Sequence, residues 1–174
     1  MYEKEPAKSY RYNDPQDADL GKILDPRHTA LLMIDMQNDF CDKEGKFAQA
    51  GRDASDVIRI VPRCKELLES ARSANVMVVH IQQSTLPGQQ SDNGGWLAFK
   101  TRDGKAPTYA TVNTWGWEHI DALKQHNDGE DGRYFEPVVL KFRPDGFLYT
   151  QLDLILRANG IESVVCCGCT TEGC

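Results

Sequence analysis

The sequence predicts an α/β fold with a mostly parallel β-sheet that is flanked by helices. Four short apolar segments have the length and composition of strands buried on both faces. They span residues 29–35, 76–82, 138–141 and 163–167. Two longer segments, 53–73 and 147–159, repeat apolar residues at intervals of three and four, as amphipathic helices do. Strands that alternate with helices indicate a parallel sheet, because parallel neighbours need a crossover connection.

The first 28 residues differ from the rest of the 174-residue chain. They are polar, contain Pro6, Pro15 and Pro26, and show no apolar periodicity. We therefore expect residues 1–28 to form an N-terminal arm and residues 29–174 to form one domain. An arm with so few apolar residues needs support, so we expect it to lie across a neighbouring subunit.

Asp53 is placed to cap the first long helix, which we expect to end near Ser73. Pro62 interrupts the apolar pattern, so the residues before it can form either the start of this helix or a separate turn. The second helix is predicted to end before Gly160, a favourable helix terminator.

The connecting segments are polar and rich in small residues. We predict loops at 36–52 and 83–116, and loops as long as the second are usually functional. One or two helical turns are expected at 117–123, and a polar break at 126–133. Residues 168–174 form a turn of mainly small residues after the last strand.

Composition excludes several classes of partner. The net charge is −6 and the pI is about 5.2, and no basic run exists, which argues against nucleic acid. The longest apolar runs, such as 30–34, are far shorter than the roughly 20 residues of a membrane span. The first residues contain no apolar signal region, so we expect a cytoplasmic protein.

The six cysteines are interpreted as reduced thiols rather than as a disulfide framework. Cys166 and Cys167 are adjacent in a strand, so their side chains point to opposite faces. We expect Cys64, Cys166 and Cys167 to be small buried hydrophobic residues.

Three reactive side chains stand at or after the carboxyl ends of three of the predicted strands. They are Asp35, Lys141 and Cys174. Each also has an ordinary structural explanation. Asp35 could cap a turn, Lys141 could be a solvated residue at a strand end, and Cys174 could be an inert buried thiol. Their joint placement is more informative, because sites in open α/β sheets lie outside the carboxyl ends of the strands. A cysteine needs activation near neutral pH; an ammonium group favours its thiolate, and a carboxylate can accept its proton.

Several motifs extend this pattern. Three segments resemble, in order, three signatures of the isochorismatase-like cysteine hydrolases. They are Asp35-Met-Gln-Asn-Asp-Phe40 after an apolar strand, residues 141–152, and residues 160–174. Residues 113–117 are similar to a loop of that family that contains glycine and tryptophan. The resemblance covers about residues 28–174 and implies a three-layer, Rossmann-like domain.

The resemblance also implies roles for the three side chains. Cys174 would be the nucleophile, Asp35 the general base and then the acid, and Lys141 the cation that holds both in their charged forms. The peptide bond between Cys169 and Thr170 would be cis, and the backbone N–H groups of Thr170 and Cys174 would form the oxyanion hole.

The chain departs from the family pattern in two places. The family's domain continues past the nucleophile, whereas this chain ends at Cys174, so we expect a chain truncated after strand four. Nicotinamidase members have an Asp-x-His motif after the second strand and bind a metal there. This chain has His80-Ile-Gln-Gln-Ser-Thr85 instead, so we predict no metal and no cofactor, and we interpret His80 as a hydrogen-bonded core residue.

The resemblance favours an amidohydrolase that acts on a small linear amide, ureido or carbamoyl compound through a thioester-type intermediate, as a homodimer or homotetramer. The branch most similar contains N-carbamoylsarcosine amidohydrolase, ureidoacrylate amidohydrolase and biuret hydrolase. The candidate substrate-binding residues are Gln37, Phe40, Trp115, Arg143 and Phe147. Arg143 is the candidate for a substrate carboxylate. Two alternatives stay open: an isochorismatase-type ether hydrolase, and a catalytically silent binding or assembly domain.

Overall fold

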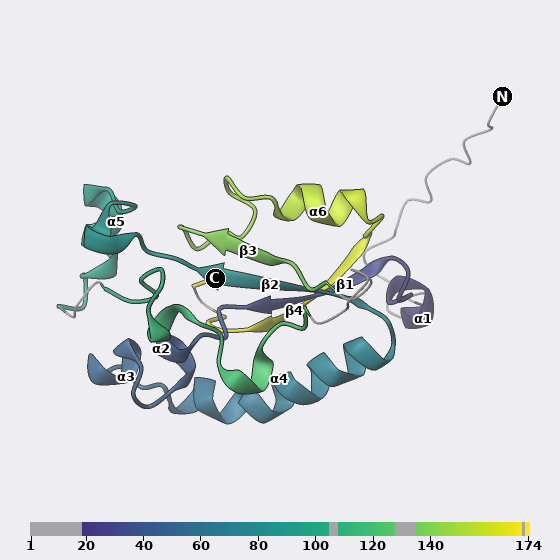
Figure 1. Ribbon diagram of the computed structural model, residues 1–174, viewed down its shortest axis with the longest axis horizontal. Helices are drawn as coiled ribbons and strands as arrows, with labels where there is room; N and C mark the ends of the chain where they lie inside the picture. Colours follow the sequence, from purple (N-terminus) through teal and green to yellow (C-terminus); the bar gives the residue numbers. More distant parts are fainter. Residues whose placement is uncertain (1–18, 105–107, 128–134, 172) are drawn as a thin grey trace.

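The structure, a computed structural model, describes residues 19–104, 108–127, 135–171 and 173–174. Its centre is a four-stranded sheet in the order β3-β2-β1-β4 (Figure 1). The strands are β1 (Thr29–Ile34), β2 (Met77–Gln83), β3 (Val138–Lys141) and β4 (Ser163–Gly168). Every neighbouring pair is parallel, which confirms the predicted fold class.

The register of the sheet places the carboxyl ends of the strands together. Strand β1 pairs on one side with β2 and on the other with β4, where Ile34 lies opposite Gly168. Strand β3 pairs with β2 so that Lys141 lies opposite Gln83. The segments that follow β1, β3 and β4 therefore start at one edge of the sheet.

Helices cover the two faces of the sheet (Figure 1). The helix α4 (Ser55–Ser73) packs on one face through Cys64, Leu68 and Ala71. The helix α6 (Leu152–Ala158) packs on the other face through Leu152 and Leu156. Alternate residues of β1 enter the two clusters, because successive side chains of a strand point to opposite faces.

The helix α4 runs without a break through Pro62, so the residues before the proline belong to the helix and not to a separate turn. Pro62 lacks an N–H and removes one backbone hydrogen bond, but the buried face of the helix outweighs this loss. The N-cap position is Ala54 rather than Asp53; the Asp53 carboxylate still accepts a hydrogen bond from the Ser55 N–H, at 2.9 Å.

Both predicted loops contain short helices. The segment 36–52 holds α2 (Asn38–Cys41) and α3 (Lys46–Gln49). The segment 83–116 holds α5 (Gly94–Lys100), where the Asn93 side chain accepts a hydrogen bond from the Trp96 N–H. These helices have at most seven residues, too few for an amphipathic repeat to be visible in the sequence. The predicted turns near 117–123 are the 3₁₀ helices Trp115–Trp117 and Asp121–Leu123.

Two boundaries differ from the prediction. Residues 20–23 of the expected arm form a helical turn, α1 (Leu20–Ile23), capped by Asp19, while residues 1–18 lie outside the described part. The second long helix is shorter than predicted, because Tyr149 adopts a left-handed backbone conformation (φ 56°) before α6 begins. Most of the predicted polar break at 126–133 also lies outside the described residues.

All six cysteines are free thiols, and one differs from its predicted environment. Cys64 is buried and Cys167 is partly buried, but Cys166 is exposed. Strand β4 has one neighbour in the described sheet, and α6 lies over β2 and β3 rather than over β4 (Figure 1). In the described ranges, no helix combines the length and the apolar character that spanning a bilayer requires.

Candidate active site

The first component of the site is the carboxylate of Asp35, directly after β1. Asp35 has a positive φ of 54°, and its N–H donates to the Ile81 carbonyl at 2.9 Å. This backbone turn directs a side chain that is 2% exposed toward the end of β2, where the Gln83 N–H donates to Asp35 Oδ1 at 2.9 Å. The local backbone thus holds one carboxylate oxygen and leaves the other for a different partner.

That partner is Lys141, the last residue of β3. Its Nζ lies 2.8 Å from Asp35 Oδ2, and its side chain is 1% exposed. The same ammonium group donates to Gln83 Oε1 at 3.2 Å and to Cys174 Sγ at 3.3 Å. The structure therefore brings together all three side chains that the sequence analysis selected at strand ends.

The turn after β4 positions Cys174. The Cys169–Thr170 peptide bond is cis, as the resemblance implied. The Cys169 thiol donates to the Asp35 carbonyl at 3.2 Å, which joins this turn to the segment after β1. The N–H groups of Gly173 and Cys174 both donate to the Thr170 carbonyl, at 3.1 and 3.0 Å.

This geometry alters the expected oxyanion hole. The Cys174 N–H is directed to the Thr170 carbonyl, so it is not an open donor, contrary to the expectation for this group. The Thr170 N–H donates to no acceptor among the hydrogen bonds of the described residues. Of the two expected donors, Thr170 is therefore the available one in this conformation.

Burial and the three charges set the protonation of the cluster. Burial raises the pKa of Asp35, against the opposing effect of Lys141. Burial alone would lower the pKa of Lys141, but Asp35 and Cys174 outweigh it and raise that pKa. Burial and then Asp35 raise the pKa of Cys174 to about 11, partly opposed by Lys141. Cys174 therefore rests as a thiol near neutral pH, and its ionisation requires a nearby base.

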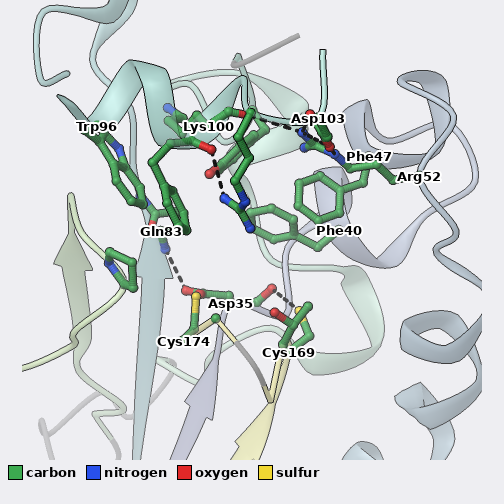
Figure 2. A pocket seen from close by; sticks show the side chains of 16 residues that line it. Asp35, Phe40, Phe47, Arg52, Gln83, Trp96, Lys100, Asp103, Cys169 and Cys174 are labelled. Carbon is green, nitrogen blue, oxygen red and sulfur yellow. Dashed lines mark hydrogen bonds and ion pairs between the residues drawn. The ribbon is translucent and has the colours of Figure 1, made fainter. Parts of the chain in front are cut away.

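A cavity of about 290 Å³ opens above this cluster. Figure 2 shows Asp35, Cys169 and Cys174 at one end and Lys100 and Asp103 at the other. Its walls are mainly aromatic: Phe40, Phe47, Trp96, Phe99 and Tyr109. Thr170 and Gly173 complete the end near the thiol. The volume is close to the lower end of the range typical for small-molecule sites.

The predicted substrate-binding residues have different positions. Phe40 lines the cavity, whereas Gln37, Trp115, Arg143 and Phe147 do not. Trp115 and Phe147 are each 49% exposed. Gln37 is buried and donates to the carbonyls of Gln83 and Trp117, at 2.9 and 2.7 Å, which gives it a supporting place behind the site.

Most residues of the cavity wall were not predicted from the sequence. Trp96, Phe99, Lys100, Arg102 and Tyr109 come from the segment 83–116, which was predicted to be a functional loop without assignment of individual residues. Gln83 was missed because an amide at the end of β2 is not itself a reactive group, unlike the side chains that follow the other three strands. No sequence pattern indicated that Arg52 belongs to the site, because only the fold brings it to the cavity.

His80 belongs to a separate buried cluster. Its Nε2 lies 3.0 Å from Glu136 Oε2, and its side chain is 1% exposed, as expected for a hydrogen-bonded core histidine. Arg72 binds the same carboxylate with two hydrogen bonds, at 2.8 and 2.9 Å. Within the described ranges, no three His, Cys, Asp or Glu side chains are arranged to hold a metal ion.

The chain is similar to several known proteins. The chain is similar to the ureidoacrylate amidohydrolase RutB of Caulobacter segnis, with 33% identity over 162 residues, which cover 87% of this chain and 64% of that protein. A solved cysteine hydrolase from Pseudomonas syringae superposes with a TM-score of 0.70 at 26% identity, over 87% of this chain and 64% of the other. The N-carbamoylsarcosine amidase of Thermoplasma acidophilum superposes with a TM-score of 0.61 at 26% identity, over 81% of this chain and 67% of the other.

The chain thus spans less than two thirds of the length of the first two relatives. The sequence pattern of the isochorismatase domain matches residues 29–174, from the start of β1 to the candidate nucleophile. With this match, the parallel sheet and the relatives at 26 to 33% identity, the chain belongs to the isochorismatase family.

Proposed function

We propose that this chain carries the catalytic centre of a cysteine-dependent hydrolase that cleaves a C–N bond of a small linear amide, ureido or carbamoyl compound. The main support is the contact of one buried ammonium group, Lys141, with both the Asp35 carboxylate and the Cys174 thiol. The cavity above them is large enough for a small molecule. The names of the relatives, ureidoacrylate amidohydrolase and N-carbamoylsarcosine amidase, favour C–N over ether hydrolysis.

In the first half of the proposed reaction, Asp35 takes the proton of the Cys174 thiol, and Sγ attacks the substrate carbonyl carbon. The protonated Lys141 lies beside both groups and stabilises the negative charge as it moves from the thiolate to the carbonyl oxygen. The Thr170 N–H is an available donor for this oxygen.

Asp35 then returns the proton to the leaving nitrogen as the C–N bond breaks, which leaves a thioester or carbamoyl thioester on Cys174. Water attacks this intermediate and gives a proton to Asp35. The C–S bond breaks, the acid product leaves, and the proton restores the Cys174 thiol. The raised pKa of Asp35 suits this exchange, because a carboxyl group with an elevated pKa can donate a proton as well as accept one.

A cytoplasmic location and a homodimeric or homotetrameric state are part of the same proposal. Light scattering at micromolar protein concentration checks the second point, and a monomer would contradict it.

The proposal is tested by ammonia release from a panel of small linear amides, ureas and carbamoyl compounds, with wild type, Cys174→Ala and Cys174→Ser. We expect both variants to lose roughly 10³-fold or more of the turnover while they remain folded. Cys166→Ser is the matched control, because Cys166 is an exposed thiol and does not line the cavity. Turnover by Cys174→Ala within tenfold of wild type would contradict the assignment. An ether hydrolase or a silent domain would release no ammonia from any compound.

A further inference from the structure

More cations than carboxylates line the cavity. They are two carboxylates, Asp35 and Asp103, and three cations, Arg52, Lys100 and Arg102. Asp35 is already paired with Lys141. The Arg52 guanidinium binds the Asp103 carboxylate in a bidentate manner, since Nε and Nη2 lie 3.1 and 3.2 Å from the two carboxylate oxygens.

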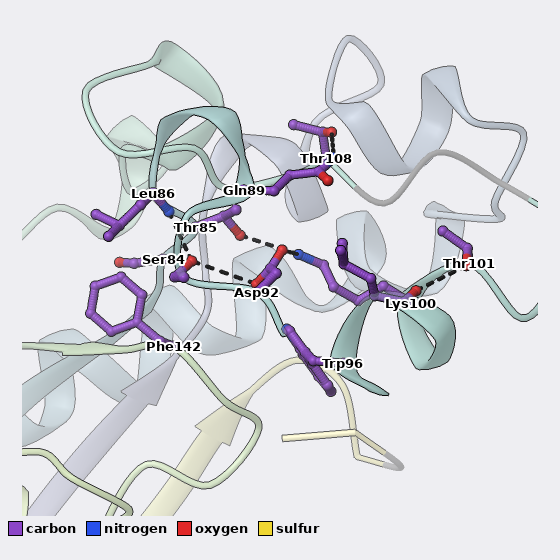
Figure 3. A network of polar contacts seen from close by, with 12 residues as sticks. Ser84, Thr85, Leu86, Gln89, Asp92, Trp96, Lys100, Thr101, Thr108 and Phe142 are labelled. Carbon is purple, nitrogen blue, oxygen red and sulfur yellow. Dashed lines mark hydrogen bonds and ion pairs between the residues drawn. The ribbon is translucent and has the colours of Figure 1, made fainter. Parts of the chain in front are cut away.

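Lys100 is neutralised inside the fold. Its Nζ lies 2.8 Å from Asp92 Oδ2, and the two side chains are 0% and 1% exposed (Figure 3). The same ammonium group is 3.4 Å from Thr85 Oγ1 and 4.7 Å from the centre of the Tyr109 ring. This buried pair fixes the end of α5, and the Thr101 hydroxyl extends the fixed segment by donating to the Leu97 carbonyl at 2.9 Å. Because its ammonium group is already paired with the Asp92 carboxylate, Lys100 is not available to bind a ligand.

Arg102 is the lining cation that has no carboxylate partner among the described residues. Its guanidinium lies 3.8 Å from the centre of the Phe99 ring, and Nη1 donates to the Phe99 carbonyl at 2.8 Å. These contacts use one of its five N–H donors and hold the plane of the group against an aromatic face. Arg102 follows the fixed end of α5 by two residues, so its backbone is held in place while its side chain is exposed.

The position of Arg102 suits the far end of a substrate. It lies in the chain between Lys100 and Asp103, which Figure 2 shows on the opposite side of the cavity from Cys174. The aromatic walls lie between the two ends and can pack against the body of the substrate. Arg143 is less suited, because it does not line the cavity and its guanidinium carbon lies 5.6 Å from the centre of the Trp96 ring.

We propose that Arg102 is a specificity-determining residue that binds a carboxylate at the end of the substrate remote from the scissile C–N bond. A planar guanidinium with free donors binds a carboxylate through two parallel hydrogen bonds. The preferred substrates are then short amido or ureido acids rather than neutral amides. The substrate class in this inference rests on the proposed function. The choice of Arg102 as the residue that binds the carboxylate rests on its having no carboxylate partner among the described residues.

The test compares 3-ureidopropionate with n-butylurea, which has nearly the same length and no carboxylate. Binding is measured by a readout other than ammonia release, namely protection of Cys174 against iodoacetamide, followed by mass spectrometry. We expect the acid to protect wild type at about tenfold lower concentration than the neutral urea. Arg102→Gln should lose this difference, Arg102→Lys should retain part of it, and Arg59→Gln, which removes an exposed charge on α4, should retain all of it.

Where turnover is measurable, Arg102→Gln should raise KM for the acid about tenfold and leave kcat within about threefold, because the anchor is remote from the reacting atoms. Thermal melting of each variant excludes a folding defect. Equal protection of wild type and Arg102→Gln by the acid would overturn the inference, as would loss of the preference in Arg143→Gln instead. Acid-selective protection that depends on Arg102, without ammonia release from any compound, would support the anchor and reject the proposed hydrolysis.

Discussion

The Lys141 ammonium lies 2.8 Å from Asp35 Oδ2, and both side chains are at most 2% exposed. A buried ion pair of this kind is sensitive to the loss of either partner, because the remaining charge stays buried without compensation. The pair also determines the state of the neighbouring thiol, since Asp35 raises and Lys141 lowers the pKa of Cys174. The two charges should therefore have opposite effects on thiol reactivity and the same effect on turnover.

The first prediction concerns Asp35→Asn, which removes a group that raises the pKa of Cys174 and keeps Lys141, which lowers it. The pKa of Cys174 should fall below its value of about 11, so more thiolate is present at pH 8. The thiolate fraction at that pH grows about tenfold each time this pKa falls by one. We therefore expect iodoacetamide to alkylate Cys174 faster than in wild type, while ammonia release is lost. Slower alkylation in this variant would contradict the electrostatic account.

The second prediction concerns the opposite change, Lys141→Met. It removes the cation that lowers the pKa of Cys174 and leaves Asp35 buried without its partner. Alkylation of Cys174 at pH 8 should become slower than in wild type, and turnover should again be lost. The free energy of unfolding should fall by about 3–5 kcal/mol, measured by urea denaturation. A variant as stable and as reactive as wild type would show that the Lys141 ammonium neither stabilises the buried Asp35 carboxylate nor lowers the pKa of Cys174.

The third prediction concerns Gly168, which ends β4 with a φ of 138°. A β-carbon there would collide with the Ile34 carbonyl oxygen in the paired strand β1. We expect Gly168→Ala to cost about 3 kcal/mol or more and to displace the turn that holds Cys174. Gly160→Ala is the matched control, because Gly160 also has a positive φ (65°) but an added β-carbon meets no atom within 4 Å. That control should lose only about 1–2 kcal/mol, and equal losses would argue against the collision.

The fourth prediction concerns acid stability and Glu136. Burial alone would raise the pKa of Glu136, but hydrogen bonds from Arg72 and His80 lower it to about 2, from an ordinary value of 4.5. Its stabilising contribution is therefore fully present above pH 4.5 and is lost as the pH falls toward 2. Over that window the loss is up to about 3 kcal/mol for this one group.

Urea denaturation at several pH values checks this. At pH 7, Glu136→Gln should be about 3–5 kcal/mol less stable than wild type, and the difference should shrink as the pH falls from 4.5 toward 2. Glu69→Gln is the control, since Glu69 also pairs with Arg72 but its side chain is 54% exposed, so its loss should cost at most about 1 kcal/mol. A difference that does not change with pH would reject the assignment to Glu136.

The fifth prediction is that chelation followed by dialysis leaves ammonia release unchanged. Residues 82–85, at the end of β2 and directly after it, have glutamine and hydroxyl side chains where a metal-binding motif would need a carboxylate and a histidine. The Gln83 amide is already engaged, since its oxygen accepts from Lys141 and its nitrogen donates to the Ser84 carbonyl. Activity that disappears with the chelator and returns with zinc, iron or manganese would show that this stretch was misinterpreted.

Strand ends were the most predictable part of the site. An apolar run that stops at a charged or reactive residue is visible along the chain, so Asp35, Lys141 and the turn before Cys174 were found without coordinates. The short helices α2, α3 and α5 were not predicted, because helices of one or two turns depend on local caps and on packing rather than on periodicity. For the same reason, the residues that α5 brings to the cavity were not identified.

The apolar patterns of the chain were sufficient to predict the fold class, the order of the elements and the three reactive side chains. Buried strands and helices have periodic apolar patterns, and parallel strands end at one edge of a sheet. The residues of the cavity wall, in contrast, are brought together by packing and could not be predicted from the sequence. Arg52, Trp96 and Arg102 line the cavity, whereas Trp115, Arg143 and Phe147 do not. Charge pairing has no sequence pattern of its own: whether an arginine is neutralised, as Arg52 is by Asp103 across 51 residues, or stays available, as Arg102 does in the described structure, depends on which carboxylates the fold brings within reach.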